Sequence, residues 1–145
     1  MKPAVDIFLT GARYRKYFGR VMAPIQKKYS LSRMDVEILF YLMNADESDD
    51  RLSDIVAFQS FNKGQASRAV TGMEQRGLLR RIPDVRDSRR LHIRLEPATK
   101  PLTEEIARAY AQVTNVIYDG CSEADIAEFR RITARITDNI DREID

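Results

Sequence analysis

The hydrophobic pattern of residues 50–95 changes its period at Gly77, and this change constrains the fold more than any other feature. Before it, apolar side chains recur at helical spacing in two short stretches, 50–59 and 62–76. After it, residues 90–95 alternate strictly between basic and apolar side chains, as in a half-buried strand. Gly77 suits the left-handed position that often follows a helix. The segment therefore predicts two helices joined by a three-residue turn and followed by a β-hairpin.

The hairpin is expected to present one basic face to water. Residues 78–82 begin its first strand, and residues 83–88 form the turn. In the second strand, alternation separates two sets of side chains. The apolar set is Leu91, Ile93 and Leu95, and the basic set is Arg90, His92 and Arg94.

Two helices are predicted before this segment. The first covers about 5–28, with Pro24 expected to kink it or end it early. Ser32 is a plausible N-cap for the second, with Asp35 three residues later. The stretch 44–50 holds four acids and no periodicity, so we expect a solvated loop. The stripe of the first helix consists of Phe8, Ala12, Phe18, Met22, Ile25 and Tyr29, and that of the second of Ile38, Leu39 and Leu42.

Two more helices are predicted after the hairpin. One follows Pro101, and the other begins after Gly120 with Ser122 as its N-cap. The apolar stripe of the last helix persists to its final turn, where a small monomer has little core left to face. A partner chain would cover this stripe, which consists of Ile126, Phe129, Ile132, Ile136, Ile140 and Ile144.

Composition indicates one globular domain of 145 residues and disfavours an enzyme. The chain is 43% hydrophobic and 32% charged, and no apolar run approaches a membrane span. Its first ten residues do not resemble a signal peptide, so we expect a cytoplasmic protein. One cysteine, Cys121, and one histidine, His92, give no disulfide, no zinc site and no convincing catalytic triad. No cofactor is expected.

Positive charge gathers in the middle of the chain. Residues 60–100 hold 10 Lys/Arg and 4 Asp/Glu, a net +6, whereas residues 101–145 hold 5 and 10, a net −5. Residues 1–59 are near neutral, with 9 and 8. A basic segment on a balanced chain is what a phosphate-facing surface requires, although a solvated hairpin without a partner has the same pattern.

The helix at 62–76 has one apolar face and one polar face, as a helix that enters the major groove would have. Ala66, Ala69, Val70 and Met73 hold it to the body. Glutamine pairs with adenine and arginine with guanine, so Gln65 and Arg68 are the candidates for base reading. Phosphates or base edges are expected to be met by Asn62, Lys63, Ser67 and Thr71.

The hairpin tip places arginines around two acids, which can fix the directions of guanidinium groups. Arg86 lies nearest the turn and could enter a narrow minor groove. Arg89 and Arg90 are expected to orient the tip or to meet phosphates. A surface salt-bridge network would have the same composition.

Three stretches resemble the multiple antibiotic resistance regulator (MarR) family of bacterial transcription factors. They are Asn62 to Arg68, the helix exit Glu74 to Leu79, and the tip motif Asp84 to Arg89. The resemblance implies a mainly α winged helix-turn-helix with N- and C-terminal dimerisation helices. The implied layout is one domain, 1–145: dimerisation helices 1–30 and 101–145, and a DNA-binding lobe 31–100 with helix-turn-helix 50–77 and wing 78–96.

The resemblance also implies a homodimer that binds a pseudo-palindromic operator, often as a repressor released by a small effector or by oxidation. Recognition helices would lie about 34 Å apart, one helical turn of DNA. The chain departs from the family at 95–99, after the second wing strand, and at Cys121, for which we expect a buried structural role. Any effector pocket would use aromatic side chains among Tyr14, Tyr17, Phe18, Tyr29 and Tyr41.

One alternative function comes from a different class of protein. A winged helix can bind another protein through the same surfaces and never bind DNA, and Gln65, Arg68 and Arg86 would then be incidental. Low sensitivity to salt would favour that alternative, because DNA affinity falls steeply with salt.

Overall fold

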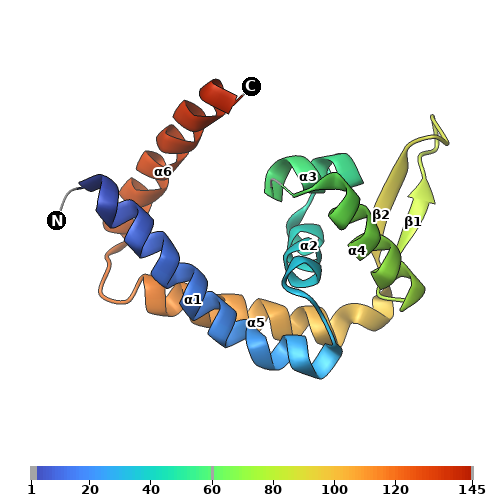
Figure 1. Ribbon diagram of the computed structural model, residues 1–145, viewed down its shortest axis with the longest axis horizontal. Helices are drawn as coiled ribbons and strands as arrows, with labels where there is room; N and C mark the ends of the chain where they lie inside the picture. Colours follow the sequence, from blue (N-terminus) through green and yellow to red (C-terminus); the bar gives the residue numbers. More distant parts are fainter. Residues whose placement is uncertain (1–2, 60, 145) are drawn as a thin grey trace. The chain divides into compact units, whose positions relative to one another are not determined.

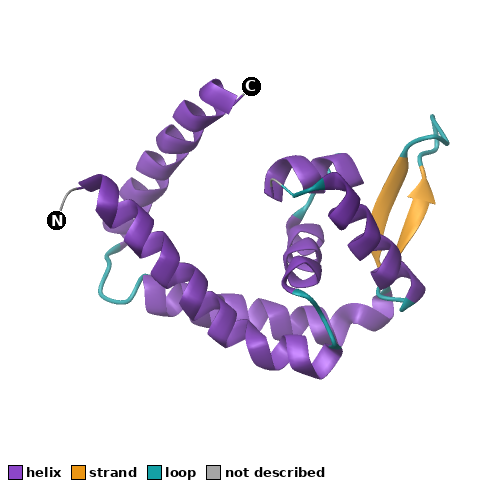
Figure 2. Cartoon of the chain, viewed as in Figure 1, coloured by secondary structure: helices purple, strands orange, loops and turns teal. Residues whose placement is uncertain are grey.

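The computed structural model describes residues 3–59 and 61–144, with side chains from Leu9 onward (Figures 1 and 2). The chain is mainly helical with one two-stranded antiparallel sheet, which confirms the predicted fold class. It divides into two compact units, Met1–Tyr110 and Ala111–Asp145. The elements are α1 (Pro3–Tyr29), α2 (Arg33–Asn44), α3 (Leu52–Gln59), α4 (Lys63–Gln75), β1 (Leu79–Pro83), β2 (Leu91–Leu95), the short 3-10 helix η1 (Pro97–Thr99), α5 (Lys100–Ile117) and α6 (Glu123–Ile144).

Helix α1 passes through Pro24 and ends at Tyr29, so the expected early end is wrong. The next residue, Ser30, has a φ of 52° and turns the chain out of the helix. Phe18, Met22 and Ile25 are buried, as the periodicity predicted, whereas Ala12 is exposed. The side chain of Phe8, the first member of the predicted stripe, lies outside the described part of the chain.

Helix α2 begins as predicted. The Ser32 hydroxyl accepts a hydrogen bond from the Asp35 N–H at 3.0 Å, and the Asp35 carboxylate accepts from the Ser32 N–H at 2.8 Å. This reciprocal capping satisfies two N–H groups that the helix itself leaves unpaired. Ile38 and Leu39 are fully buried, and they place α2 in the centre of the first unit.

Helices α3 and α4 form the predicted helix-turn-helix. Asn62 caps α4, and its side-chain oxygen accepts from the Gln65 N–H at 3.1 Å. Gly77 follows the helix with a φ of 72°, a conformation that costs glycine little and other residues more. The buried side chains of α3 and α4 are Ile55, Ala66, Val70 and Met73.

Strands β1 and β2 pair in antiparallel register, with Leu79 opposite Leu95 at the base and Pro83 opposite Leu91 near the tip. Pro83 was expected in the turn but closes β1, a position where proline removes little pairing. The apolar side of the hairpin is buried only in part: Ile93 is 2% exposed, but Leu91 is 42% exposed. Within the first unit, α4 lies alongside the hairpin (Figure 1).

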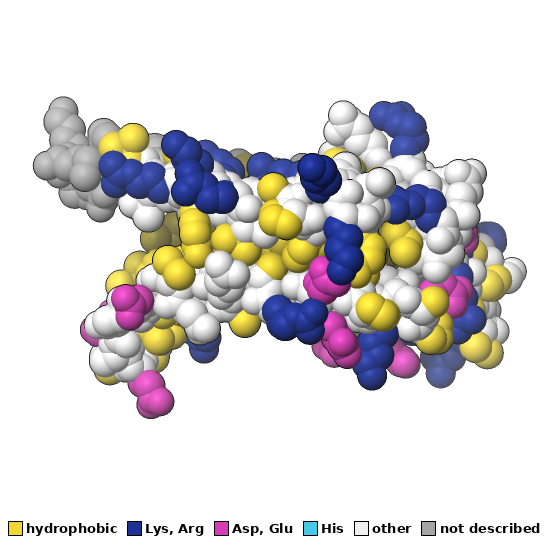
Figure 3. Space-filling view, turned by 90° about the horizontal axis from the view of Figure 1, so that it is seen from below, with side chains coloured by type: hydrophobic (Ala, Val, Ile, Leu, Met, Phe, Trp, Pro, Cys, Tyr) yellow, Lys and Arg dark blue, Asp and Glu magenta, His cyan; other side chains and the backbone are white. Residues whose placement is uncertain are grey.

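The second unit contains the end of α5, a turn and α6. The Ser122 hydroxyl accepts from the Asp125 N–H at 3.1 Å and so caps α6 as predicted. No described residue of α6 is buried, and its apolar stripe remains open to solvent, with Phe129 54% and Ile140 53% exposed. Cys121 is also exposed, so the expectation of a buried cysteine is wrong for the single chain: the residue lies in the turn after Gly120. Apolar side chains on the molecular surface are yellow in Figure 3.

Candidate nucleic-acid interface

The N-terminal half of α4 presents the predicted base-reading side chains to solvent. Lys63, Gln65 and Arg68 are exposed. Within the described part of the chain, these side chains take part in no hydrogen bond or ion pair. They are therefore available to an external partner. The start of a helix also carries partial positive charge, which favours anions such as phosphates.

Gly64 has no side chain and so adds no bulk to this half of α4. A Cβ atom built on Gly64 would lie 3.3 Å from Asn62 Oδ1 and 3.7 Å from Arg68 Nη1. The Arg68 guanidinium thus reaches back over the first turn of the helix. The Asn62 side-chain oxygen caps the helix, as the sequence predicted, so Asn62 has this role beside its expected contact with DNA. These residues give the first turn of α4 a fixed shape.

Two other predicted contacts, Ser67 and Thr71, are half-buried at the edge of the exposed surface. The Thr71 hydroxyl accepts a hydrogen bond from Arg81 Nη2 at 3.1 Å. Arg81 also pairs with the Glu74 carboxylate, which in addition accepts the Arg81 backbone N–H at 3.0 Å. This cluster fastens the C-terminal half of α4 to β1. This cluster could not be predicted from the sequence, because its partners come from different elements.

The tip of the hairpin is built around Asp84. One carboxylate oxygen accepts the backbone N–H of Arg86 at 2.7 Å and of Asp87 at 2.9 Å. The other oxygen lies 2.9 Å from His92 Nε2. Hydrogen bonding to His92 and to the two N–H groups holds the pKa of the Asp84 carboxyl well below its usual range. Asp84 therefore stays charged and fixes the turn.

Asp87 and the neighbouring arginines complete the tip. The Asp87 carboxylate accepts the Arg89 backbone N–H at 3.1 Å and Arg89 Nε at 3.0 Å, and it lies 3.6 Å from Arg90 Nε. These contacts lower the pKa of Asp87, with the Arg89 side chain as the largest cause. Arg86 differs from both, because its exposed side chain has no partner among the described residues. Its backbone is fixed while its guanidinium is free.

The basic side of β2 differs from the expected wet face. His92 Nδ1 lies 2.5 Å from the Asp50 carboxylate, and Arg94 forms an ion pair with the same group. Asp50 is only 2% exposed, so the expectation that all of 44–50 is solvated is wrong at its last residue. Its backbone oxygen also accepts the Ile93 N–H at 2.9 Å. Asp50 thus joins the chain entering α3 to β2, and it covers the cations that composition suggested were free.

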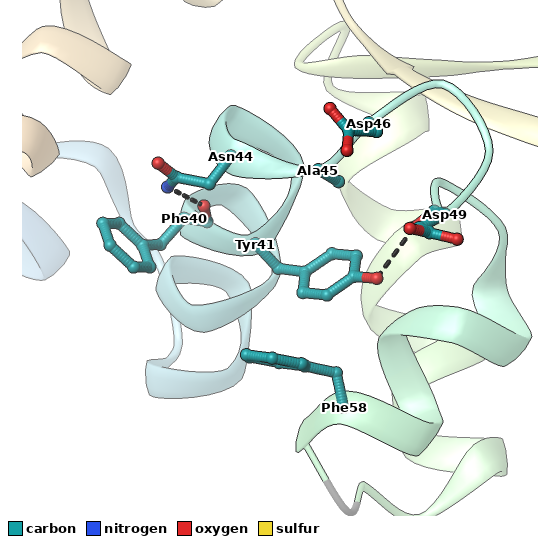
Figure 4. Close-up of a pocket in the computed structure, with 7 residues that line it drawn as sticks. All are labelled: Phe40, Tyr41, Asn44, Ala45, Asp46, Asp49 and Phe58. Atoms are coloured by element: carbon teal, nitrogen blue, oxygen red, sulfur yellow. Dashed lines mark hydrogen bonds between the residues drawn. The ribbon is translucent and has the colours of Figure 1, made fainter. Parts of the chain in front are cut away.

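The five aromatic residues suggested for an effector pocket lie on α1 and α2. Tyr14 stacks on Phe18, with ring centres 6.0 Å apart, and Phe18 meets Tyr110 edge-on at 5.0 Å. The Tyr29 hydroxyl donates to Glu105 at 2.8 Å, and Tyr17 is half-buried on α1. Tyr41 lines a cavity of about 260 Å3, together with Phe40, Asn44, Ala45, Asp46, Asp49 and Phe58 (Figure 4).

Structure comparison finds similar chains among solved structures, transcriptional regulators among them. Transcriptional regulator PA3341 matches with a TM-score of 0.83 and 22% identity, over 96% of this chain and 98% of that one. MepR of S. aureus, in a DNA complex, matches with 0.70 and 15%, over 98% of each chain. CouR of Rhodococcus jostii RHA1, bound to p-coumaroyl-CoA, matches with 0.74 and 16%, over 90% and 87%. At these identities the likeness shows the fold.

Sequence comparison points to the same family. No curated protein sequence matches the chain. No helix of the described residues is long and apolar enough to cross a membrane. The sequence profile described as the MarR family matches residues 29–90, which contain the helix-turn-helix and most of the wing. This match shows that residues 29–90 are similar to the MarR family of transcriptional regulators, a non-enzymatic family, and the chain as a whole shares the fold of solved MarR regulators.

Proposed function

We propose that the protein is a sequence-specific regulator that binds double-stranded DNA as a homodimer on a pseudo-palindromic operator. The observation that carries this proposal is that several Lys and Arg side chains have no acidic partner within the described chain. On α4 and at the wing tip, Lys63, Arg68 and Arg86 are exposed and free of partners in the described chain. The backbone beneath them is held by the Asn62 cap and the Asp84 turn. Free cations on a fixed backbone suit a duplex, because binding then breaks no internal ion pair and need not order the backbone.

Each part of this surface has a separate role in the proposal. Gln65 and Arg68 read base edges in the major groove, while Lys63 and the first turn of α4 meet phosphates. The margin of this surface consists of Asn62, Ser67 and Thr71. These residues position α4 and contact the DNA backbone. Arg86 enters the minor groove, and Arg89 and Arg90 shape the tip around Asp87 and add positive charge near phosphates.

The second unit supplies the dimer. A row of large apolar side chains on α6 is 41% to 71% exposed, which is costly for a chain that works alone. A second copy of the same helix would bury this row, and the two recognition helices could then meet successive major grooves. Ile136→Glu is expected to convert a dimer into a monomer, which light scattering would detect. The row comprises Phe129, Ile132, Ile136, Ile140 and Ile144.

We further propose that the dimer represses transcription and is released by a small effector. CouR has been seen with p-coumaroyl-CoA and MepR with DNA, so chains of this fold bind both kinds of partner. An effector lowers DNA affinity only if it binds more tightly to a conformation that does not fit the operator. A protein that acts on the bacterial chromosome works in the cytoplasm.

Fluorescence anisotropy with DNA fragments from around the protein's own gene tests the proposal. Salt near 50 mM and near 200 mM should give affinities that differ by orders of magnitude if several phosphates are contacted. Arg86→Ala should weaken binding about tenfold, as loss of one groove contact would. Arg20→Ala, which removes an exposed arginine on α1, is the matched control and should change little.

A protein-interaction winged helix remains the second candidate, and the same experiment separates the two. Binding no tighter to any fragment than to random DNA, with Arg86→Ala and Arg20→Ala equal to wild type, would reject DNA regulation and leave protein binding. Binding to an inverted repeat would give the operator and a reporter for effector screening.

A further inference from the structure

We propose that the cavity between α2, the loop 45–49 and α3 binds an aromatic cation of one or two rings. This inference rests on the proposed function in one respect, because it makes the cavity the effector site of the regulator. The cavity belongs wholly to the first unit. It differs from the pocket expected from the sequence, of whose five residues it contains only Tyr41.

Aromatic rings form the walls of this cavity. Tyr41 and Phe58 lie with ring centres 5.1 Å apart and planes tilted by 52°. Phe58 is 72% exposed, although it is one of the largest apolar residues of the lobe. Phe40 stacks on Tyr110 of α5, and this contact holds its ring in place. An aromatic guest would cover the exposed Phe58 ring, and ring faces also attract cations.

Polar groups around the cavity are almost entirely acceptors. The Tyr41 hydroxyl donates its proton to the Asp49 backbone oxygen at 2.8 Å, and Asn44 Nδ2 donates to the Phe40 oxygen at 2.8 Å (Figure 4). The carboxylates of Asp46 and Asp49 take part in no ion pair or hydrogen bond within the described chain. Among the described residues, no Lys, Arg or His lines this cavity.

The charges around the cavity therefore favour a positively charged ligand. Two unpaired carboxylates beside aromatic faces attract a cation and repel an anion. Burial, followed by the charges of Asp54 and Asp49, raises the pKa of Tyr41, which keeps its hydroxyl protonated and neutral. At about 260 Å3 the cavity lies just below the range that holds drug-sized ligands, so it suits one or two rings.

The cavity is next to both parts of the proposed DNA surface. Asp49 precedes Asp50, whose buried carboxylate holds His92 and Arg94 of the wing. Phe58 lies in the last turn of α3, just before the turn that leads into α4. A guest that pushes on Asp49 and Phe58 would shift the wing base and the helix-turn-helix together. That coupling gives a ligand of modest size a route to lower DNA affinity.

Titration calorimetry on the full-length protein tests the ligand class with three probes of nearly equal shape: naphthylmethylammonium, naphthylmethanol and naphthoate. We expect the cation to bind about tenfold more tightly than the alcohol and the anion to bind least. The double variant Asp46→Asn, Asp49→Asn should reduce cation binding to the level of the alcohol and leave alcohol binding unchanged. Phe58→Ala should weaken both. Glu104→Gln, an exposed acid on α5 outside the cavity, is the matched control.

The outcomes separate this inference from the proposed function. Equal binding of the three probes, or a double variant that binds the cation as wild type does, would overturn the cation site whether or not the protein binds DNA. Calorimetry needs no operator, so failure to find one leaves this test intact. If the cation binds and an operator is known, the cation should lower DNA affinity for the wild type and not for the double variant.

Discussion

The base of the wing and Arg86 at its tip both carry positive charge but differ in pairing. At the base, Arg81 and Arg94 are bound to acids of the protein itself, Glu74 and Asp50. At the tip, the Arg86 side chain extends from a fixed turn and forms no hydrogen bond or ion pair with a described residue. The net charge of the segment therefore overstates the charge that a partner can meet. Arginines that are paired with acids, such as Arg81 and Arg94, therefore hold the wing together, whereas Arg86 and Arg68 remain available to a partner.

The largest expected effect is that of Asp50→Ala. This substitution leaves His92 and Arg94 without the buried carboxylate that pairs them. Loss of a buried partner costs about 3 to 5 kcal/mol, and because Arg94 is about a third exposed we expect about 2 to 3 kcal/mol. Urea denaturation would measure the free energy of unfolding. Glu47→Ala removes the exposed acid 4.0 Å from the same arginine and should cost less than about 0.5 kcal/mol. An equal loss of unfolding free energy in the two variants would mean that the buried acid stabilises the wing no more than the exposed acid does.

Substituting a paired arginine should lower stability, whereas substituting an unpaired arginine should lower DNA affinity. Arg81→Ala breaks the bonds to Thr71 and Glu74, so it should lower unfolding free energy by about 1 to 2 kcal/mol. Arg68→Ala removes no contact within the described chain, so stability should stay within about 0.5 kcal/mol while operator affinity falls about tenfold. Denaturation and anisotropy on both variants make the test. A stable Arg81→Ala protein that loses more DNA affinity than Arg68→Ala would reverse the assignment.

Salt dependence should distinguish contacts to phosphates from contacts to bases. Lys63→Ala is expected to weaken all DNA sequences alike and to reduce the slope of log affinity against log salt by about 1. Gln65→Ala should leave that slope unchanged and relax preference at one base pair. Anisotropy over a series of salt concentrations and operator variants measures both. If Gln65→Ala altered the slope and not the preference, α4 would lie differently on the duplex.

The smallest effect concerns acid stability at the tip. The pKa of Asp84 is lowered by folding from its usual 3.8, so its contribution is complete above that value and is lost as pH falls further. The difference in urea midpoint between wild type and Asp84→Asn should be present at pH 6 and shrink below about pH 4. Val85→Ala, at a fully exposed neighbour, should differ from wild type by the same small amount at every pH. A constant difference for Asp84→Asn would mean that the carboxylate does not fix the turn.

Local chemistry made several elements predictable. Ser32 and Asn62 cap their helices because a side-chain oxygen needs only a partner three residues away. Gly77 ends α4 for an equally local reason. Strict alternation identified β2, because the side-chain period of a strand is 2.

Contacts between distant segments could not be predicted. Asp50 is one of four acids in a polar stretch, and nothing within it marks the one that pairs with a strand 42 residues later. For the same reason His92 was expected at the surface, although both its nitrogens face carboxylates. Pro24 misled differently: a proline weakens a helix, but packing of Met22 and Ile25 on either side keeps α1 continuous.

Arg76, at the C-terminal cap of α4, donates to the backbone oxygens of Tyr29 and Ser30 where α1 ends. These oxygens belong to the electronegative end of α1, so a cation is the natural group to close it. The Arg76 side chain thereby connects α4, the proposed recognition helix, to the end of α1. A displacement of the end of α1 would therefore be felt at the end of α4 through this side chain, in addition to any effect through the hydrophobic core.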